Sequence, residues 1–166
     1  PAALAAWLTQ RDMGATQIHV LEALGGPRER HRTSAAAAFS LTDVAAPVSL
    51  ALDAAALPRG AGLPRGTGLP DTWFAHDGQI TKQPMRALTL SALAPKPGAL
   101  LWDVGAGSGS VSVEWALSGG QAQAIEARAD RIANIRANIA AFGLGDRVSA
   151  LLGDAPDALT ALPEPD

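Results

Sequence analysis

The glycine-rich stretch at residues 105–109, Gly-Ala-Gly-Ser-Gly, is the feature that most constrains the fold of this chain. It follows a short apolar run, residues 100–104, which is typical of a buried strand because Pro97-Gly98 precedes it and glycines follow it. A helix-like apolar segment, residues 111–117, comes directly afterwards. A strand, a glycine loop and a helix in this order indicate an α/β sheet that holds a ligand at a helix N-terminus.

Two acidic residues near the glycine loop indicate the kind of ligand. Asp103 lies two residues before the first glycine, where a carboxylate would repel a pyrophosphate and suit a ligand with an ammonium and a sulfonium. Glu126 ends the next apolar run, residues 122–125, where a bidentate acceptor would suit a ribose diol. The dinucleotide pattern G-x-G-x-x-G would require glycine at Ser110. The pattern favours S-adenosylmethionine over NAD; the structural alternative is a tight turn with acidic caps.

The clearest helix is predicted at residues 130–142, where Asp130 begins it and Gly143 supplies a left-handed stop. Its apolar stripe consists of Ile132, Ile135, Ile139 and Phe142. A third apolar strand is predicted at residues 147–152. With right-handed crossovers, these elements form one half of a doubly wound, mostly parallel sheet. We therefore expect a Rossmann-like α/β fold of which only the first half is present.

Asp154 follows the third predicted strand, beside the glycine loop. Its carboxylate could accept the amino group of an adenine, or it could cap a helix ahead of Pro156, and both could hold. The sequence ends at Asp166. Half a sheet leaves an open parallel edge, so we expect either a truncated sequence or a partner chain that completes the fold.

The segment before the glycine loop predicts an amphipathic helix over residues 81–93, with Thr81 as N-cap and Pro84 in its first turn. Its expected buried residues are Met85, Leu88 and Leu93, and Trp73 and Phe74 are expected to point inward just upstream. In a functional alternative, residues 78–82 fold over a ligand in the glycine loop. Lys82 and Arg86 would then offer positive charge to an acidic substrate.

The first third of the chain predicts a helix over residues 2–11 and strands over 18–24 and 47–52. These elements are too few to bury a core alone, which is typical of the tail of a larger domain. Arg28, Arg30 and Arg32 are interpreted as a solvated loop beside Glu29, with an anion-binding cluster as the alternative. The three histidines, His19, His31 and His76, lack metal-ligand spacing and receive no role.

A domain boundary is expected at residues 57–70, where a Leu-Pro-Arg-Gly unit nearly repeats, because such Pro and Gly density sustains neither helix nor sheet. The predicted organisation is residues 1–56, a linker at 57–70, and residues 71–166. A net charge of −3 without a basic stripe argues against nucleic-acid binding. The chain has no cysteine, no signal-peptide pattern and no apolar span long enough for a membrane, so a cytoplasmic protein is expected.

Four segments together resemble the decarboxylating precorrin methyltransferases of cobalamin (vitamin B12) biosynthesis, whose domain is a class I methyltransferase. They are Gly-Leu-Pro-Asp-Thr-Trp-Phe at 68–74, Ile-Thr-Lys-Gln-Pro-Met-Arg at 80–86, Trp-Asp-Val-Gly-Ala-Gly-Ser-Gly-Ser-Val-Ser-Val-Glu at 102–114, and Gly-Asp-Ala-Pro-Asp-Ala-Leu at 153–159. Residues 20–30 resemble the end of an α/β tetrapyrrole methylase domain. A chain that carries both domains in this order is similar to the fused enzymes that act on precorrin-6Y.

The resemblance implies roles for particular residues. The loop from Gly105 through Ala106, Gly107 and Ser108 to Gly109 would wrap the methionine part of S-adenosylmethionine, and Glu126 would hold the ribose. Asp154 and Ala155 would border the adenine, and Thr81 would close over the cofactor.

The implied reaction is methylation of C15 of a precorrin with loss of CO₂ from the C12 acetate, giving S-adenosylhomocysteine. No residue is assigned to the decarboxylation, and self-association is expected from the family. Two alternatives are a non-catalytic fragment or assembly piece of that enzyme and an NAD-dependent oxidoreductase.

Overall fold

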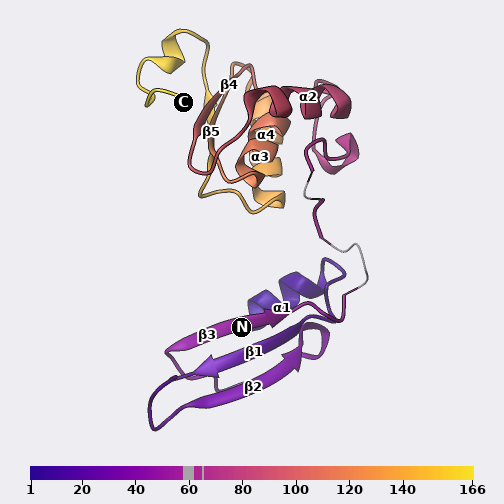
Figure 1. Cartoon of the computed structure of the whole chain (residues 1–166), viewed down its shortest axis with the longest axis vertical. Coiled ribbons are helices and arrows are strands. Elements are labelled where there is room, and N and C mark those ends of the chain that lie inside the picture. Colours follow the sequence, from indigo (N-terminus) through magenta and orange to yellow (C-terminus); the bar gives the residue numbers. More distant parts are fainter. Residues whose placement is uncertain (58–61, 65) are drawn as a thin grey trace. The chain divides into compact units, whose positions relative to one another are not determined.

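The computed structural model of the chain describes every residue except 58–61 and 65. It divides into two compact units, Pro1–Leu63 and Pro64–Asp166 (Figure 1). The predicted linker at 57–70 therefore lies partly outside the described residues. Its last residues are structured, because Leu69 is buried in the core of the second unit.

In its described residues the first unit contains a three-stranded antiparallel sheet, in the order β2-β1-β3, and the α-helix α1. Alternate residues of β1 are buried, as expected for a strand with one covered face. Ile18 and Val20 on that face pack with Ala5 and Leu8 of the helix. The elements are α1 (Ala2–Thr9), β1 (Gln17–Glu22), β2 (Arg30–Ala35) and β3 (Val48–Asp53).

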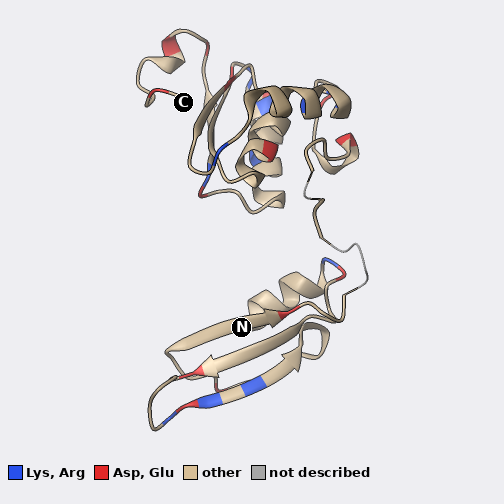
Figure 2. Cartoon of the chain, in the orientation of Figure 1, with Lys and Arg blue, Asp and Glu red and all other residues tan. Residues whose placement is uncertain are grey.

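The interpretation of the basic cluster as a solvated loop is wrong for Arg30 and Arg32, which lie on β2. Glu22 of β1 is paired in register with Arg30, so the charged residues of both strands gather at one end of the sheet (Figure 2). The sequence did not indicate this strand, because its charged and polar side chains show no alternation of apolar and polar residues.

The second unit contains a parallel sheet in the order β4-β5-β6, and Figure 1 shows the labelled helices of this unit on the same side of that sheet. The mixed α/β fold and the predicted strands around the glycine loop are confirmed, with ends that shift by a residue or two. The helices are α2 (Gln83–Leu93), α3 (Ser110–Leu117) and α4 (Ala129–Ala141), and the strands are β4 (Leu100–Val104), β5 (Gln121–Glu126) and β6 (Val148–Leu152).

The predicted helix after β5 is confirmed as α4, and three of its apolar stripe residues, Ile132, Ile135 and Ile139, are buried. Phe142 is partly buried and stacks on Phe74 with ring centroids 5.2 Å apart. Gly143 has φ +67°, as predicted for a left-handed residue after a helix end. The second unit therefore has its core between α4, α3 and the sheet.

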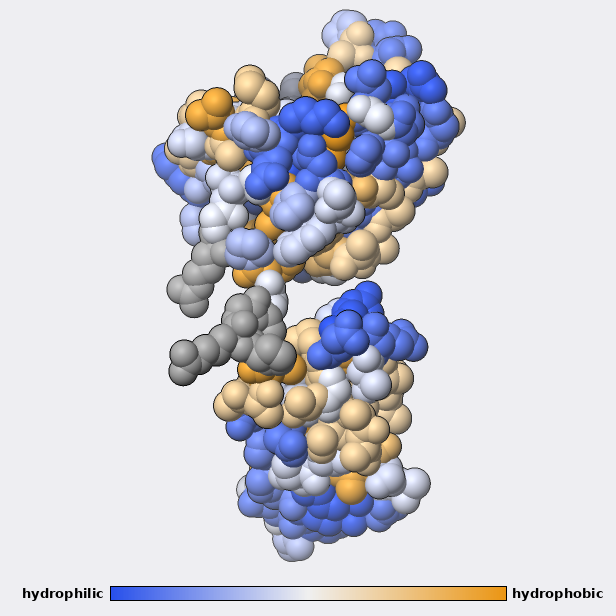
Figure 3. All heavy atoms as spheres, turned by 90° about the vertical axis from the view of Figure 1, so that its right-hand side faces the viewer, coloured by the Kyte–Doolittle hydropathy of each residue, from blue (hydrophilic) through white to orange (hydrophobic). Residues whose placement is uncertain are grey.

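The predicted face of α2 is wrong. Met85 and Leu88 are 58% and 64% exposed, and Leu93 is also exposed, whereas Arg86 and Leu90 are fully buried. Lys82, not Thr81, is the N-cap of this helix, although Pro84 does occupy its first turn. On the face of the second unit drawn in Figure 3, hydrophobic residues (orange) lie at the surface beside hydrophilic ones (blue).

Just upstream of α2, only half of the expected aromatic pair is buried. Phe74 is buried, and Trp73 is 43% exposed. Within the described ranges, none of the helices has the length and apolar content needed to span a membrane.

Candidate functional site

The glycine loop lies between the end of β4 and the start of α3. Gly105, Gly107 and Gly109 have φ values of +74°, +60° and +71°, a region that glycine enters without steric cost. The N–H groups of Gly105 and Ala106 both donate to the carbonyl of Ile125, at 2.8 and 3.0 Å. These bonds fix the loop against the end of the neighbouring strand.

The two outer glycines of the loop face different surroundings. A Cβ on Gly105 would meet no heavy atom within 4 Å, so this part of the loop borders open space. A Cβ on Gly109 would lie 3.0 Å from Cγ2 of Ile135 on α4, so this part is packed. The loop thus has an inner side against α4 and an accessible side near the end of β4.

Asp103 lies near the end of β4 and contacts the first turn of α3. Its Oδ2 accepts hydrogen bonds from the backbone N–H and the hydroxyl of Ser112, at 3.2 and 2.7 Å. Burial raises the pKa of the Asp103 carboxyl above its ordinary value, and the nearby Glu126 carboxylate adds to this increase, while the Ser112 hydrogen bonds oppose it. One oxygen of the predicted cation-facing carboxylate is therefore bound to α3.

Glu126 ends β5 and is buried beside the glycine loop. Its Oε2 accepts the N–H of Gly107 at 2.9 Å, and its Oε1 accepts the N–H of Arg128 at 3.0 Å. An ionised carboxylate has about four acceptor positions, so about two are left for a ligand. Among the described residues, neither Glu126 nor Asp103 forms an ion pair.

The segment after β6 lies at the same edge of the sheet. Gly153 donates its N–H to the carbonyl of Glu126 at 3.0 Å. Asp154 and Ala155, which follow, are exposed. The capping alternative for Asp154 is wrong, because the next helical turn, Asp157–Leu159, has Pro156 as its N-cap. Its contact with adenine stays a prediction.

Residues 75–82, here called the strap, lie against the glycine loop. The carbonyl oxygen of Gln79 is 3.5 Å from the position that a Cβ on Gly107 would take. Arg131 of α4 donates from Nε to Oδ2 of Asp77 at 3.0 Å, which fastens the middle of the strap. The Thr81 side chain is exposed, and its predicted closure over a cofactor is untested.

Asn138 of α4 is a site residue that the sequence did not indicate. Its Oδ1 accepts the N–H of Ala75 at 2.7 Å, and its Nδ2 donates to the carbonyls of Ala75 and Ser108 at 3.0 and 2.8 Å. Its partners are main-chain atoms, which every residue has, so the sequence does not reveal them. An asparagine near the end of a predicted helix is too common to signal this role.

The prediction that Arg86 meets a substrate is wrong. Its side chain is fully buried, and its Nε donates to Oε1 of Glu114 at 2.5 Å. The guanidinium also bonds to Asp71 and to the carbonyls of Thr81 and Leu69. Lys82, by contrast, is 62% exposed and lies 3.9 Å from Asp71, so it is accessible to a substrate.

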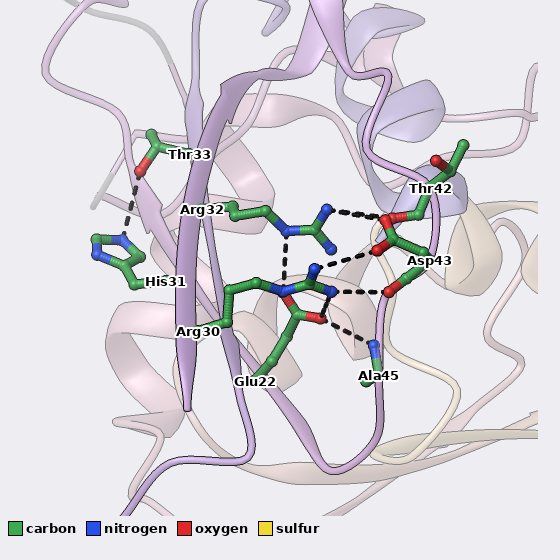
Figure 4. A network of polar contacts seen from close by, with 8 residues as sticks. All are labelled: Glu22, Arg30, His31, Arg32, Thr33, Thr42, Asp43 and Ala45. Atoms are coloured by element: carbon green, nitrogen blue, oxygen red, sulfur yellow. Dashed lines mark hydrogen bonds and ion pairs between the residues drawn. The ribbon is translucent and has the colours of Figure 1, made fainter. Parts of the chain in front are cut away.

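Arg30 and Arg32 of the first unit form a separate network around a buried carboxylate (Figure 4). Glu22 accepts hydrogen bonds from Arg30 at 2.7 Å and Arg32 at 3.0 Å, and both arginines also bind Asp43. The hydrogen bond from Arg30 is the main cause that lowers the pKa of Glu22 from 4.5 to about 2. Both guanidiniums are thus already neutralised, which disfavours the alternative that this cluster binds an anion.

The histidines do not form a metal centre in the described residues. Nδ1 of His19 lies 3.1 Å from Nε2 of His31 across β1 and β2, a contact that their sequence spacing did not suggest. The hydroxyl of Thr33 is within hydrogen-bond distance of both nitrogens. No group of three or more histidine, aspartate or glutamate side chains that could hold a metal ion occurs in the part of the chain that is described.

The parallel sheet and the left-handed glycine loop at its carboxyl edge define a Rossmann-like protein of the class I methyltransferase type. Residues 72–166 match the family described as the precorrin methyltransferase domain. The chain belongs to this family.

The relatives agree with this assignment. The chain is 46% identical over 168 residues to a precorrin-6Y C(5,15)-methyltransferase [decarboxylating] of Sinorhizobium sp, and 47% identical over 160 residues to one of Mycobacterium tuberculosis. These matches cover 100% and 95% of this chain but 40% of each relative. The chain therefore spans less than half the length of these relatives.

A solved structure shares the fold of part of the chain. It is the C-terminal domain of precorrin-6Y C5,15-methyltransferase from Rhodobacter capsulatus, which is 62% identical with a TM-score of 0.61. The match covers 62% of this chain and 56% of that structure.

Proposed function

We propose that the second unit holds S-adenosylmethionine and serves in the methylation of C15 of a precorrin, with release of CO₂ from the C12 acetate, in cobalamin biosynthesis. The names of the relatives, which are decarboxylating precorrin-6Y C(5,15)-methyltransferases, support this reaction. The main supporting observation is the pair of carboxylates, Asp103 and Glu126, beside an open left-handed glycine loop. In the described residues neither carboxylate forms a salt bridge.

The described residues fit this cofactor. A sulfonium and an ammonium would compensate the two neighbouring carboxylates, whose mutual repulsion contributes to the raised pKa of Asp103. The remaining acceptor positions of Glu126 suit a ribose diol. The Ser108 hydroxyl is buried and has no hydrogen-bond partner among the described residues, so it offers one unused polar group within the loop.

When bound, S-adenosylmethionine would supply an electrophilic methyl group. The residues of this chain would mainly hold and orient it, since methyl transfer to an electron-rich carbon gains most from proximity and alignment. The glycine loop would hold the methionine part, Asp154 and Ala155 would border the adenine, and Thr81 would cover the cofactor from the strap. We assign no residue to the decarboxylation.

Lys82 is our candidate for a substrate carboxylate, because its ammonium is exposed at the beginning of α2. Arg86 is buried in its ion pair with Glu114 and has no part in this proposal. We also propose that residues 1–56 are the end of a tetrapyrrole methylase domain, that the protein is cytoplasmic, and that it self-associates. Sedimentation of the purified chain tests the last point directly.

Calorimetric titration of this chain with S-adenosylhomocysteine tests the cofactor site. We expect saturable binding that NAD does not displace, and binding weakened about tenfold or more in Glu126→Gln, since a charged acceptor is lost. Glu164→Gln, an exposed carboxylate near the end of the chain, is the matched control. Displacement by NAD would favour an oxidoreductase, and the absence of binding would favour a non-catalytic piece.

Incubation with S-adenosylmethionine and precorrin-6Y tests the reaction. We expect methyl transfer to C15 together with CO₂ release. Binding of S-adenosylhomocysteine without either product would limit this chain to the cofactor half of the function.

A further inference from the structure

Asn138 links the strap to the glycine loop. Its side chain is 2% exposed, and it uses both amide hydrogens and its carbonyl oxygen in hydrogen bonds. Both main-chain groups of Ala75, at the start of the strap, are bound to this one side chain, and the third bond reaches the carbonyl of Ser108 in the glycine loop. Among the described side chains, it is the one that bonds to both segments.

We propose that Asn138 is a positioning residue of the cofactor site, which sets the separation between the strap and the glycine loop. This inference rests on the proposed function, because the position of the strap matters to catalysis only if a cofactor occupies the loop. The relevant separation is short: the carbonyl of Gln79 stands 3.5 Å from where a Cβ on Gly107 would lie. A small displacement of the strap would therefore change the wall of the site.

The other fastenings of the strap do not replace Asn138. The Arg131–Asp77 ion pair is partly exposed, with side chains 21% and 31% accessible, and pairs of this kind contribute little. Arg86 binds the carbonyl of Thr81, and this bond holds the far end of the strap to α2. In the described residues, Arg86 makes no hydrogen bond to the glycine loop. Asn138 is thus the buried connection between the two walls.

The chemistry of the amide is specific. An aspartate at this position would keep an acceptor for the N–H of Ala75 but would turn an oxygen toward the carbonyls of Ala75 and Ser108. Two acceptors facing each other repel, and an ionised carboxylate there would also be a buried charge with only the N–H of Ala75 as donor. Asn138→Asp should therefore disturb the link without changing the volume of the side chain.

The test compares Asn138→Ala and Asn138→Asp with two controls. Asn134→Ala lies one turn earlier on α4 and removes an amide that makes no side-chain hydrogen bond in the described residues. Val148→Ala removes apolar volume from the same core, on β6. Amide hydrogen exchange over residues 75–82 is measured without ligand, and S-adenosylhomocysteine affinity is measured by calorimetry.

We expect both Asn138 variants to exchange the strap amides at least about tenfold faster and to bind the ligand about tenfold more weakly, the loss of one to two net hydrogen bonds. In the two control variants, neither strap exchange nor ligand affinity should change by more than the change in overall stability explains. Wild-type exchange in the strap of Asn138→Ala, or an equal loss of affinity in Val148→Ala at matched stability, would overturn the inference.

The two hypotheses fail in different ways. If the unmodified chain does not bind the ligand, the proposed cofactor site fails and the positioning role falls with it, even where exchange shows that Asn138 couples the two segments. If the unmodified chain binds and Asn138→Ala binds equally well, only the positioning role fails.

Discussion

Arg86 and Glu114 form an ion pair in which both side chains are buried, with Nε and Oε1 2.5 Å apart. The Glu114 carboxylate also accepts the N–H groups of Gly68 and Leu69. The pair therefore joins α2, α3 and the chain that enters the second unit, and it determines which face of α2 is buried.

Replacing Arg86 by Met should destabilise the chain by roughly 3–5 kcal/mol, because Glu114 would be left as an uncompensated buried charge. Arg86→Lys should cost less, since a cation is retained while the planar donors are lost. Urea unfolding followed by circular dichroism measures both. Met85→Ala, on the exposed face of the same helix, is the control, and a loss below about 1 kcal/mol in Arg86→Met would contradict the role of the pair.

Asp103→Asn should stabilise the folded chain at pH 7 while it weakens S-adenosylhomocysteine binding. The pKa of Asp103 is raised above 3.8 in the folded state, so the contribution of its protonated form is present at low pH and is lost as the pH rises through the folded pKa. Asparagine can still accept from Ser112 and has no charge to bury.

Urea midpoints of wild type and Asp103→Asn at pH 4 and pH 7 measure this effect. The advantage of the variant should be larger at pH 7. An advantage that is larger at pH 4, or tighter ligand binding in the variant, would contradict this account of Asp103.

Gly105→Ala and Gly109→Ala should differ in what they damage. Both force a side chain into a left-handed conformation, at roughly 1–2 kcal/mol each. The Gly109 methyl would also press on Ile135, so this variant should lose more stability, whereas the Gly105 methyl points into open space where a ligand would lie. Thermal unfolding measures the loss of stability in each variant, and calorimetry measures the loss of S-adenosylhomocysteine affinity. Equal losses of affinity in the two variants would argue against the open side of the loop as the binding surface.

The first unit should lose stability in acid through Glu22. Its pKa is lowered from 4.5 to about 2, so its contribution is present above about pH 4.5 and declines as the pH falls toward 2. NMR signals of β1 and β2 amides during an acid titration measure this loss. In Glu22→Gln the same signals should already be weak at the pH values where the wild-type signals are strong. Glu29→Gln, which removes an exposed charge and keeps an acceptor for the N–H of Gly25, should behave like wild type.

Local sequence patterns predicted the parallel half of the fold well because each strand there is a short apolar run bounded by glycine or proline. The acidic positions of the site followed from the rule that ligands bind at the carboxyl ends of parallel strands. Asp103 and Glu126 do lie together at that edge, while their contacts with a cofactor stay predictions.

Hydrophobic spacing failed where polar partners distant in sequence decide the packing. The apolar residues of α2 suggested that Met85 and Leu88 are buried. Instead, Arg86 pairs with Glu114, 28 residues later, and the face of α2 that carries Arg86 is the buried one. β2 was missed for a similar reason, since the pairing of β2 with β1 brings Arg30 and Arg32 to the carboxylates of Glu22 and Asp43, which are distant in sequence. Propensity carries no information about such pairings.

The three bonds of Asn138 all end on main-chain atoms, which has an evolutionary consequence. Any substitution at position 75 other than proline leaves in place the N–H and carbonyl that Asn138 binds, and the carbonyl at position 108 is present whatever side chain stands there. The link itself therefore makes no demand on the side chains at positions 75 and 108, and its selective constraint falls on the codon of Asn138. Any constraint on the Ser108 hydroxyl comes from the proposed cofactor site instead.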